Sequence, residues 1–222
     1  VVIDEVDTYR GVFGSHTANV LRRLRRIAAM YGANPTFICC SATIGNPLEL
    51  VQELTGLRVR LVDNDGAPRG RRIMGWWNPP LANESTGRRG SANIEAARLL
   101  SGLARRRIRS ITFTLARSTA ELILRYARDL LKPDGLATKV MAYRGGYLPE
   151  QRREIERRLF DGDLLAVTST TALELGVDIG GIDAVIMVGY PGSIAGVWQQ
   201  AGRAGRGGQD SLALLIALGG GI

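Results

Sequence analysis

The chain has 222 residues, 45% of them hydrophobic and 6% aromatic, and its formal net charge is +8. This length suits one large domain, or one and a half ordinary domains, built around an aliphatic core. The sequence contains no segment typical of a signal peptide or a membrane span, and its basic charge favours an anionic partner, with nucleic acid as the first candidate.

A short buried strand is predicted at the start, where residues 1–3 are apolar and Asp4, Glu5 and Asp7 follow. The carboxyl end of such a parallel strand typically faces a ligand crevice. At this place the first carboxylate can hold Mg²⁺ through water, and the second can orient or deprotonate an attacking water. An acidic turn is the alternative interpretation of these residues taken alone.

A helix capped by Ser15 is expected to run until Gly32 stops it. Residues 36–40 then form a predicted strand that contains Cys39 and Cys40. Neighbouring side chains of a strand point to opposite faces, so the two cysteines suit neither a metal site nor an ordinary disulfide. Core packing in a reduced, cytoplasmic protein is the prediction.

The next segments are predicted to be a helix, a strand and then a connection. Asn46 caps the helix, Pro47 occupies its first position and Gly56 lies near its end. A strand over residues 57–62 follows. The composition then shifts to glycine, proline, asparagine and arginine, which indicates a connection between two domains.

This connection is predicted to contain one strand-like segment over residues 73–77. Trp76 and Trp77 lie within it, and tryptophan side chains can stack on nucleic-acid bases. Because Pro79 and Pro80 follow directly, packing of the connection against a domain is the favoured interpretation.

The second half alternates helices with short apolar runs, which is typical of a doubly wound parallel sheet. Ser118 and Glu121 are predicted to form a capping box for a helix that ends before Pro133. The other expected helices cover residues 93–106 and 149–160, and a last one carries two arginines. The expected strands cover residues 110–114, 139–142, 164–168, 184–188 and 212–218.

Arg203 and Arg206 lie three residues apart on a glycine-rich segment that begins at Gln199. Three residues is close to one helical turn, so both guanidinium groups are predicted to project from one face. Planar, permanently charged guanidinium groups suit a polyphosphate, because each can bind two oxygens. A solvated basic loop is the alternative for these residues in isolation.

Several segments together resemble superfamily 2 helicases, the DEAD/DEAH-box group. The runs Asp4-Glu5-Val6-Asp7, Ser41-Ala42-Thr43 and residues 199–206 resemble motifs II, III and VI of that group, in the same order. Residues 168–179 resemble motif V, and residues 111–114 with Arg117 resemble motif IV. Residues 8–16 and 143–147 resemble, more narrowly, bacterial mitomycin-repair (MrfA-type) DNA helicases and their fungal RecQ-related relatives. The resemblance covers nearly the whole chain apart from residues 78–91.

The resemblance implies an α/β fold with parallel RecA-like sheets. Residues 1–66 would be the C-terminal part of a first, ATP-binding RecA-like domain. Residues 67–92 would be the interdomain connection, and residues 93–222 a near-complete second RecA-like domain.

The implied function is that of an ATP-dependent DNA helicase or translocase. It would couple ATP hydrolysis at a two-domain cleft to movement on single-stranded or partly duplex DNA, in the 3′→5′ direction and in DNA repair. An ATP-dependent RNA helicase is one alternative. A non-catalytic nucleic-acid-binding module that has lost its phosphate loop is another.

The same resemblance implies the residues of an ATP and Mg²⁺ site. Asp4 would coordinate Mg²⁺, and Glu5 would act on the attacking water. Gln199 would place that water or the γ-phosphate, and Arg203 and Arg206 would act as arginine fingers.

Further residues are implied to bind the nucleotide, to relay domain closure or to bind nucleic acid. Gly176 and Asp178 would contact the nucleotide, while Asp7, Ser41 and Thr43 would relay closure. Contacts to the phosphates of nucleic acid are implied for Thr114, Arg117, Arg144, Gly145, Thr168, Ser169 and Thr170.

The sequence departs from the family pattern in three places. Asp7 stands where the MrfA-type branch usually has histidine, and Gln200 stands where many superfamily members have arginine. The chain also contains no Gly-x-x-x-x-Gly-Lys-[Ser/Thr] motif, the loop that cradles phosphates in P-loop NTPases. We therefore expect an internal piece of a larger enzyme, inactive alone, whose phosphate loop would lie upstream of Val1.

Overall fold

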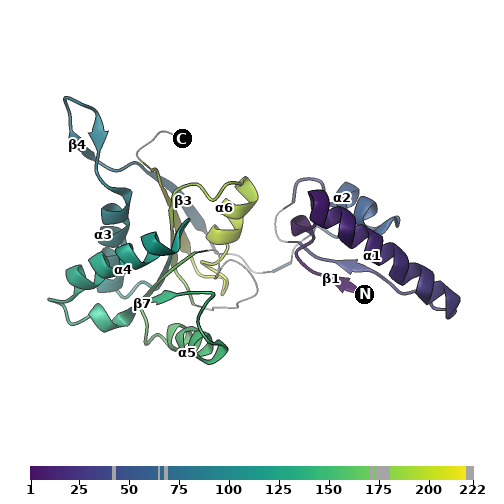
Figure 1. Ribbon diagram of the computed structural model, residues 1–222. Coiled ribbons are helices and arrows are strands. Elements are labelled where there is room, and N and C mark those ends of the chain that lie inside the picture. Colours follow the sequence, from purple (N-terminus) through teal and green to yellow (C-terminus); the bar gives the residue numbers. More distant parts are fainter. Residues whose placement is uncertain (42–43, 65, 68–69, 171–172, 174–180, 219–222) are drawn as a thin grey trace. The chain divides into compact units, whose positions relative to one another are not determined.

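The computed structural model describes residues 1–41, 44–64, 66–67, 70–170, 173 and 181–218. The chain forms two compact units, Val1–Ala67 and Pro68–Ile222 (Figure 1). Within the described residues, neither unit contains a helix that is long and apolar enough to cross a membrane.

The first unit is a small α/β assembly. Its two-stranded parallel sheet pairs β1 (Val2–Ile3) with β2 (Ile38–Cys39). A 3₁₀ helix, η1 (Val6–Thr8), and the helices α1 (Gly11–Met30) and α2 (Pro47–Thr55) complete it. Its described core consists of the buried side chains of Ile3, Val6, Ala18, Leu21, Val51 and Leu54.

Two predicted boundaries in this unit are wrong, and one is confirmed. Helix α1 begins four residues before Ser15, whose hydroxyl donates to the Gly11 carbonyl oxygen at 3.0 Å from inside the helix. Helix α2 matches its prediction and ends at Thr55, with Gly56 as its C-cap at a φ of 65°. Residues 57–62 form no strand, because an apolar run becomes a strand only where another strand pairs with it.

The two cysteines lie at different depths in the first unit. Cys39 is half-buried and packs against the core, and this burial raises the pKa of its thiol. Cys40 is exposed. The prediction of core packing is therefore wrong for Cys40, which follows the last residue of β2.

The second unit is built on a six-stranded sheet in which every strand pair is parallel. This confirms the predicted doubly wound α/β fold. In spatial order the strands are β3 (Arg72–Trp77), β10 (Ser211–Ile216), β9 (Ala184–Val188), β6 (Ser110–Thr114), β8 (Ala166–Ser169) and β7 (Val140–Tyr143).

Helices cover both faces of this sheet. Helices α3 (Ala92–Arg105) and α4 (Arg117–Leu131) pack on one face, where Ile186 and Val188 of β9 point. Helix α5 (Pro149–Phe160) and the end of α6 (Ile194–Ala201) pack on the other face, where Val185 and Met187 point. A 3₁₀ helix, η2 (Ala137–Lys139), precedes β7. The alternation along β9 is that of a strand buried on both faces.

The segment predicted as an interdomain connection contributes directly to this sheet. Its strand-like part is β3, which pairs with β10 from Arg72 opposite Ser211 to Trp77 opposite Ile216. Residues 78–91 then form a small antiparallel hairpin with strands β4 (Leu81–Asn83) and β5 (Arg88–Arg89) (Figure 1). Among the described residues the sheet therefore has six strands, one more than the five that the sequence predicted for this half.

Candidate ATP and nucleic-acid sites

The acidic residues of the first unit lie at the carboxyl end of β1. The Asp4 carboxylate is exposed, and its Oδ1 accepts a hydrogen bond from the Glu5 amide at 2.9 Å. Glu5 has φ 50° and ψ 48°, a left-handed conformation that costs a non-glycine residue about 1–2 kcal/mol. The Val6 amide donates to the Cys40 carbonyl oxygen at 3.0 Å and ties this turn to the end of β2.

Two of the three predicted coupling residues are in direct contact. The Ser41 hydroxyl donates to Asp7 Oδ1 at 2.6 Å, which links the end of β2 to η1. Thr43, the third residue, lies outside the described residues, as do Gly176 and Asp178. Aspartate at position 7 thus keeps a hydrogen bond to the Ser-Ala-Thr segment.

The surroundings of Asp4 fit a magnesium ion that is held mainly by phosphates and water. No group of three or more His, Cys, Asp or Glu side chains able to hold a metal is present in the described part of the chain. Mg²⁺ in phosphate-transfer sites needs only one or two protein carboxylates, because substrate oxygens and water complete its octahedron. An exposed carboxylate at the end of a strand meets that requirement.

The two arginines of the glycine-rich segment do not lie on one helical face, so that prediction is wrong. Helix α6 ends at Ala201, two residues before Arg203, and the chain continues as turns. Arg203 is buried, with 6% of its surface exposed, whereas Arg206 is exposed. Gln199 is half-buried on α6.

Hydrogen bonds to neighbouring residues fix this segment against the sheet. Arg72 of β3 donates from Nη2 to the Ala204 carbonyl oxygen at 3.3 Å, and the Gly205 amide donates to Ile182 at 2.9 Å. Gly205 has a φ of 76°, in the left-handed region that glycine adopts without strain. The chain therefore reverses at Gly205 and presents Arg206 to solvent.

The candidate nucleic-acid residues gather at the carboxyl edge of three adjacent strands, β6, β8 and β7. The Thr114 hydroxyl lies within reach of two carbonyl oxygens, of Ala116 at 2.9 Å and of Ser169 at 3.3 Å. The Ser169 hydroxyl donates to the Tyr143 carbonyl oxygen at 3.3 Å. These bonds tie the three strand ends together.

The predicted contact residues differ in their access to solvent. Arg117 and Gly145 are exposed, and Arg144 and Thr170 are half-buried. Thr168 and Ser169 are fully buried and Thr114 is 4% exposed, so their hydroxyl groups face the interior. A contact from these three side chains to nucleic acid stays a prediction.

Arg144 is held by Glu121, for which the sequence predicted a capping role instead. Arg144 Nε donates to Glu121 Oε1 at 2.6 Å, and Nη2 contacts the same oxygen. The predicted capping box is wrong, since Ala116 is the N-cap of α4 and Glu121 bonds Arg144 instead. No sequence signal reveals this pair, because its members are 23 residues apart.

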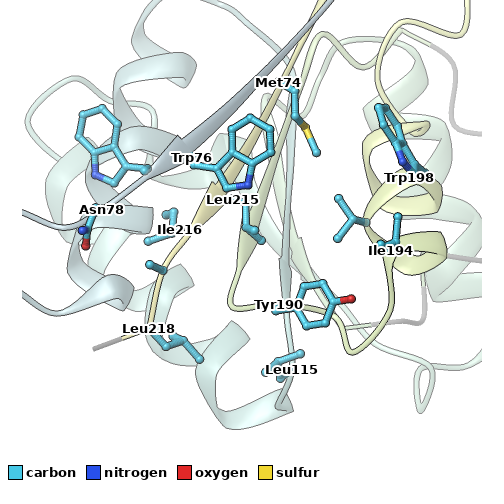
Figure 2. Close-up of a pocket in the computed structure, with 13 residues that line it drawn as sticks. Met74, Trp76, Asn78, Leu115, Tyr190, Ile194, Trp198, Leu215, Ile216 and Leu218 are labelled. Carbon is cyan, nitrogen blue, oxygen red and sulfur yellow. The ribbon is translucent and has the colours of Figure 1, made fainter. Parts of the chain in front are cut away.

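The second unit also has an apolar groove of about 720 Å³ near the carboxyl ends of β3 and β10. Figure 2 shows Trp76, Tyr190 and Trp198 along it, with Ile194 on α6. Trp76 is 71% exposed and Trp77 is 37% exposed. The predicted packing against a domain therefore leaves most of the Trp76 side chain uncovered.

Comparison with known proteins identifies the family. The helicase conserved C-terminal domain matches residues 94–208, which is more than half of the chain. The ATP-dependent helicase YprA of Bacillus subtilis is 52% identical over 217 residues, which cover 98% of this chain and 29% of YprA. The ATP-dependent helicase HRQ1 of Saccharomyces cerevisiae is 44% identical over 223 residues, which cover 98% of this chain and 21% of HRQ1.

Solved structures agree with this assignment. The crystal structure of the DUF1998 helicase MrfA bound to DNA superposes with a TM-score of 0.92 and 52% identity, over 98% of this chain and 29% of that one. MrfA bound to DNA and AMPPNP gives a TM-score of 0.91 at the same identity, over 98% of this chain and 30% of that one. The chain thus spans less than a third of these relatives, and it belongs to the helicases that share this RecA-like C-terminal domain, with MrfA-type and HRQ1 proteins among its relatives.

Proposed function

We propose that this chain is part of the motor of an ATP-dependent DNA helicase or translocase, which couples ATP hydrolysis to movement on single-stranded DNA. One observation carries the proposal: MrfA, a helicase crystallised with DNA and AMPPNP, is 52% identical over 98% of the chain. Movement in the 3′→5′ direction and a role in DNA repair are the finer parts of the proposal, and they rest on the resemblance to mitomycin-repair helicases.

Hydrolysis is proposed to use the acidic turn of the first unit and the arginine segment of the second. Glu5 orients the attacking water, and Gln199 helps to place that water or the γ-phosphate. Arg203 and Arg206 stabilise the charge that develops on the transferred phosphate. Mg²⁺, when bound by Asp4, would neutralise charge on the β- and γ-phosphate oxygens. Gly176 and Asp178 contact the nucleotide, and Asp7, Ser41 and Thr43 relay closure.

Nucleic acid is proposed to lie along the carboxyl edge of β6, β8 and β7. The exposed Arg117 and the half-buried Arg144 supply positive charge there, and Gly145 and Thr170 supply backbone and hydroxyl donors. Contacts of this kind go to phosphates and position the strand without reading its sequence.

The substrate is tested by comparing nucleic acids as activators. We expect single-stranded DNA to stimulate ATP hydrolysis by the full-length gene product more strongly than RNA of equal length and base composition. Stronger stimulation by RNA would identify an RNA helicase. Binding of nucleic acid without ATP hydrolysis would point to the non-catalytic module.

The 222-residue chain by itself is expected to hydrolyse no ATP. It contains no Gly-x-x-x-x-Gly-Lys-[Ser/Thr] sequence, so it lacks the backbone cradle and the lysine that hold the β- and γ-phosphates. Phosphate release at saturating single-stranded DNA should equal that of a protein-free blank. DNA-stimulated release by the purified chain would show that this motif is not required here.

A further inference from the structure

The guanidinium group of Arg144 contacts both a carboxylate and an aromatic ring. On its edge, Nε and Nη2 both engage Oε1 of Glu121 from the first turns of α4. The group also lies over the Tyr147 ring, whose centroid is 5.4 Å from the guanidinium carbon. Hydrogen bonding to the Glu121 carboxylate raises the pKa of Arg144.

The backbone that carries Arg144 is fixed as well. The Tyr147 amide donates to the Arg144 carbonyl oxygen at 3.2 Å and closes a turn directly after β7 (Figure 1). A Cβ atom on Gly146 would lie 3.8 Å from Arg117 Nη2, so the second arginine passes close to this turn. Two guanidinium groups thus approach one short turn at the edge of the sheet.

The contacts of Arg144 leave one nitrogen of its guanidinium group available to a ligand. Nη1 donates no hydrogen bond within the described part of the chain, while Nε and Nη2 are occupied by Glu121. About a third of each partner's side chain is exposed, 35% for Arg144 and 36% for Glu121. Nη1 can therefore meet a ligand while the other nitrogens stay bound to the protein.

We propose that Glu121 is a positioning residue, which holds Arg144 in the orientation that binds a nucleic-acid phosphate. The inference rests on the proposed function and names one supporting residue of its nucleic-acid site. Glu121 itself does not touch the phosphate, because two anions repel each other. Its effect is to restrict the rotamers of a long, flexible side chain before the ligand arrives.

A carboxylate beside a phosphate-binding arginine has two opposing effects. It lowers the local positive potential, which weakens the attraction for phosphate, and the pair is exposed enough for solvent to screen this effect. The carboxylate also orders the Arg144 side chain before binding, so less side-chain entropy is lost when the phosphate binds. The simultaneous contacts to Glu121 and Tyr147 favour the second effect.

The test measures the affinity of the full-length gene product for a fluorescein-labelled 20-nucleotide oligo-dT by fluorescence anisotropy. We expect Glu121→Gln to weaken binding about three- to tenfold, the scale of ordering one long side chain. Arg144→Ala should weaken binding at least as much and lower the salt dependence by about one phosphate contact. Glu121→Gln should keep the wild-type salt dependence, because Arg144 remains.

Asp134→Asn is the matched control. Asp134 accepts a hydrogen bond from Arg105 Nε at 2.8 Å, with exposures of 39% and 45%, beyond the opposite end of α4. The substitution Asp134→Asn changes the net charge by the same amount as Glu121→Gln, so an effect of charge alone would appear in both variants. We expect Asp134→Asn to bind as tightly as the wild type or slightly more tightly.

The possible results separate this inference from the proposed function. In the Arg144→Ala background, Glu121→Gln should have little further effect, because no Arg144 side chain remains to be positioned, and such non-additivity supports positioning. Unchanged or tighter binding by Glu121→Gln, with weak binding by Arg144→Ala, overturns the inference and leaves the proposed function intact. Normal binding by Arg144→Ala overturns both the inference and this part of the interface, and absence of binding by the wild type overturns the proposed function. Thermal unfolding of each variant ensures that only folded proteins are compared.

Discussion

Replacing Arg206 with alanine in the full-length gene product is expected to lower kcat for ATP hydrolysis by about three decades or more, the scale of an arginine finger. The affinity for ATP should change far less, because a finger acts mainly on charge that develops in the transition state. Arg206 is exposed and follows a glycine turn, so its truncation removes a charged side chain without opening the core. Steady-state kinetics together with fluorescent-nucleotide binding measure both quantities.

Arg206→Lys and Arg88→Ala make this experiment specific. Lysine keeps the charge but lacks the planar fork, so a strong loss of kcat is also expected for Arg206→Lys. Arg88 is an exposed arginine of β5 in the same unit, and its removal should leave kcat unchanged. Near-normal kcat in Arg206→Ala would mean that this side chain is a solvated cation with no catalytic part.

Arg203→Ala is expected to lower kcat on a similar scale, but its interpretation differs. Arg203 is 6% exposed and lies in the turn that follows α6. Truncating a long buried side chain destabilises its surroundings as well as removing its charge. Thermal unfolding must therefore accompany the kinetics of Arg203→Ala, and the exposed Arg206 gives the cleaner test.

The elements that the sequence predicted well are those that local patterns determine. The sequence predicts strands β6 and β9 with their observed bounds, because β9 is a continuous apolar run and β6 combines β-branched and aromatic residues. Helix α5 was predicted over its observed residues, since Pro149 occupies its first turn and its apolar residues recur at helical spacing.

Features that depend on distant partners were not predictable in this way. Strand β3 lies between segments that contain glycine and proline, so its sequence suggests a connection. In the structure Arg72 of β3 pairs with Ser211 of β10, which is 139 positions away in the chain. Glu121 reads as a capping residue until Arg144 is brought beside it by the pairing of β7 with β8. The spacing of Arg203 and Arg206 suggested a single helical face, and it failed because α6 ends at Ala201.

Hydrogen exchange on the 222-residue chain should divide the strands into two groups. Amides in β6, β8 and β9 are expected to exchange about a hundredfold or more slowly than those of the β1–β2 pair, because local opening is far less costly where few apolar contacts must be broken. Among the described residues, six buried apolar side chains form the core of the first unit, while clusters of 16 and 15 line the two faces of the larger sheet. Mass spectrometry of peptic peptides from both units in one sample measures this difference.

The structure gives the physical reason why amides of the β1–β2 pair should exchange fast. Strands β1 and β2 have two residues each, and their outward side chains are uncovered: Val2 is 68% exposed and Ile38 is 55% exposed. Beside the ladder of the two strands, backbone bonds run from Ile38 to Val1, from Cys40 to Ile3 and from Val6 to Cys40, and neither strand has a second neighbour among the described residues. A parallel sheet this short, with apolar side chains exposed, opens readily.

Helix α2 packs on the same small core, so its amides serve as the internal control and should exchange on the timescale of β1 and β2. Equal protection in both units would contradict this prediction. It would show that the first unit folds cooperatively on its own despite its small core.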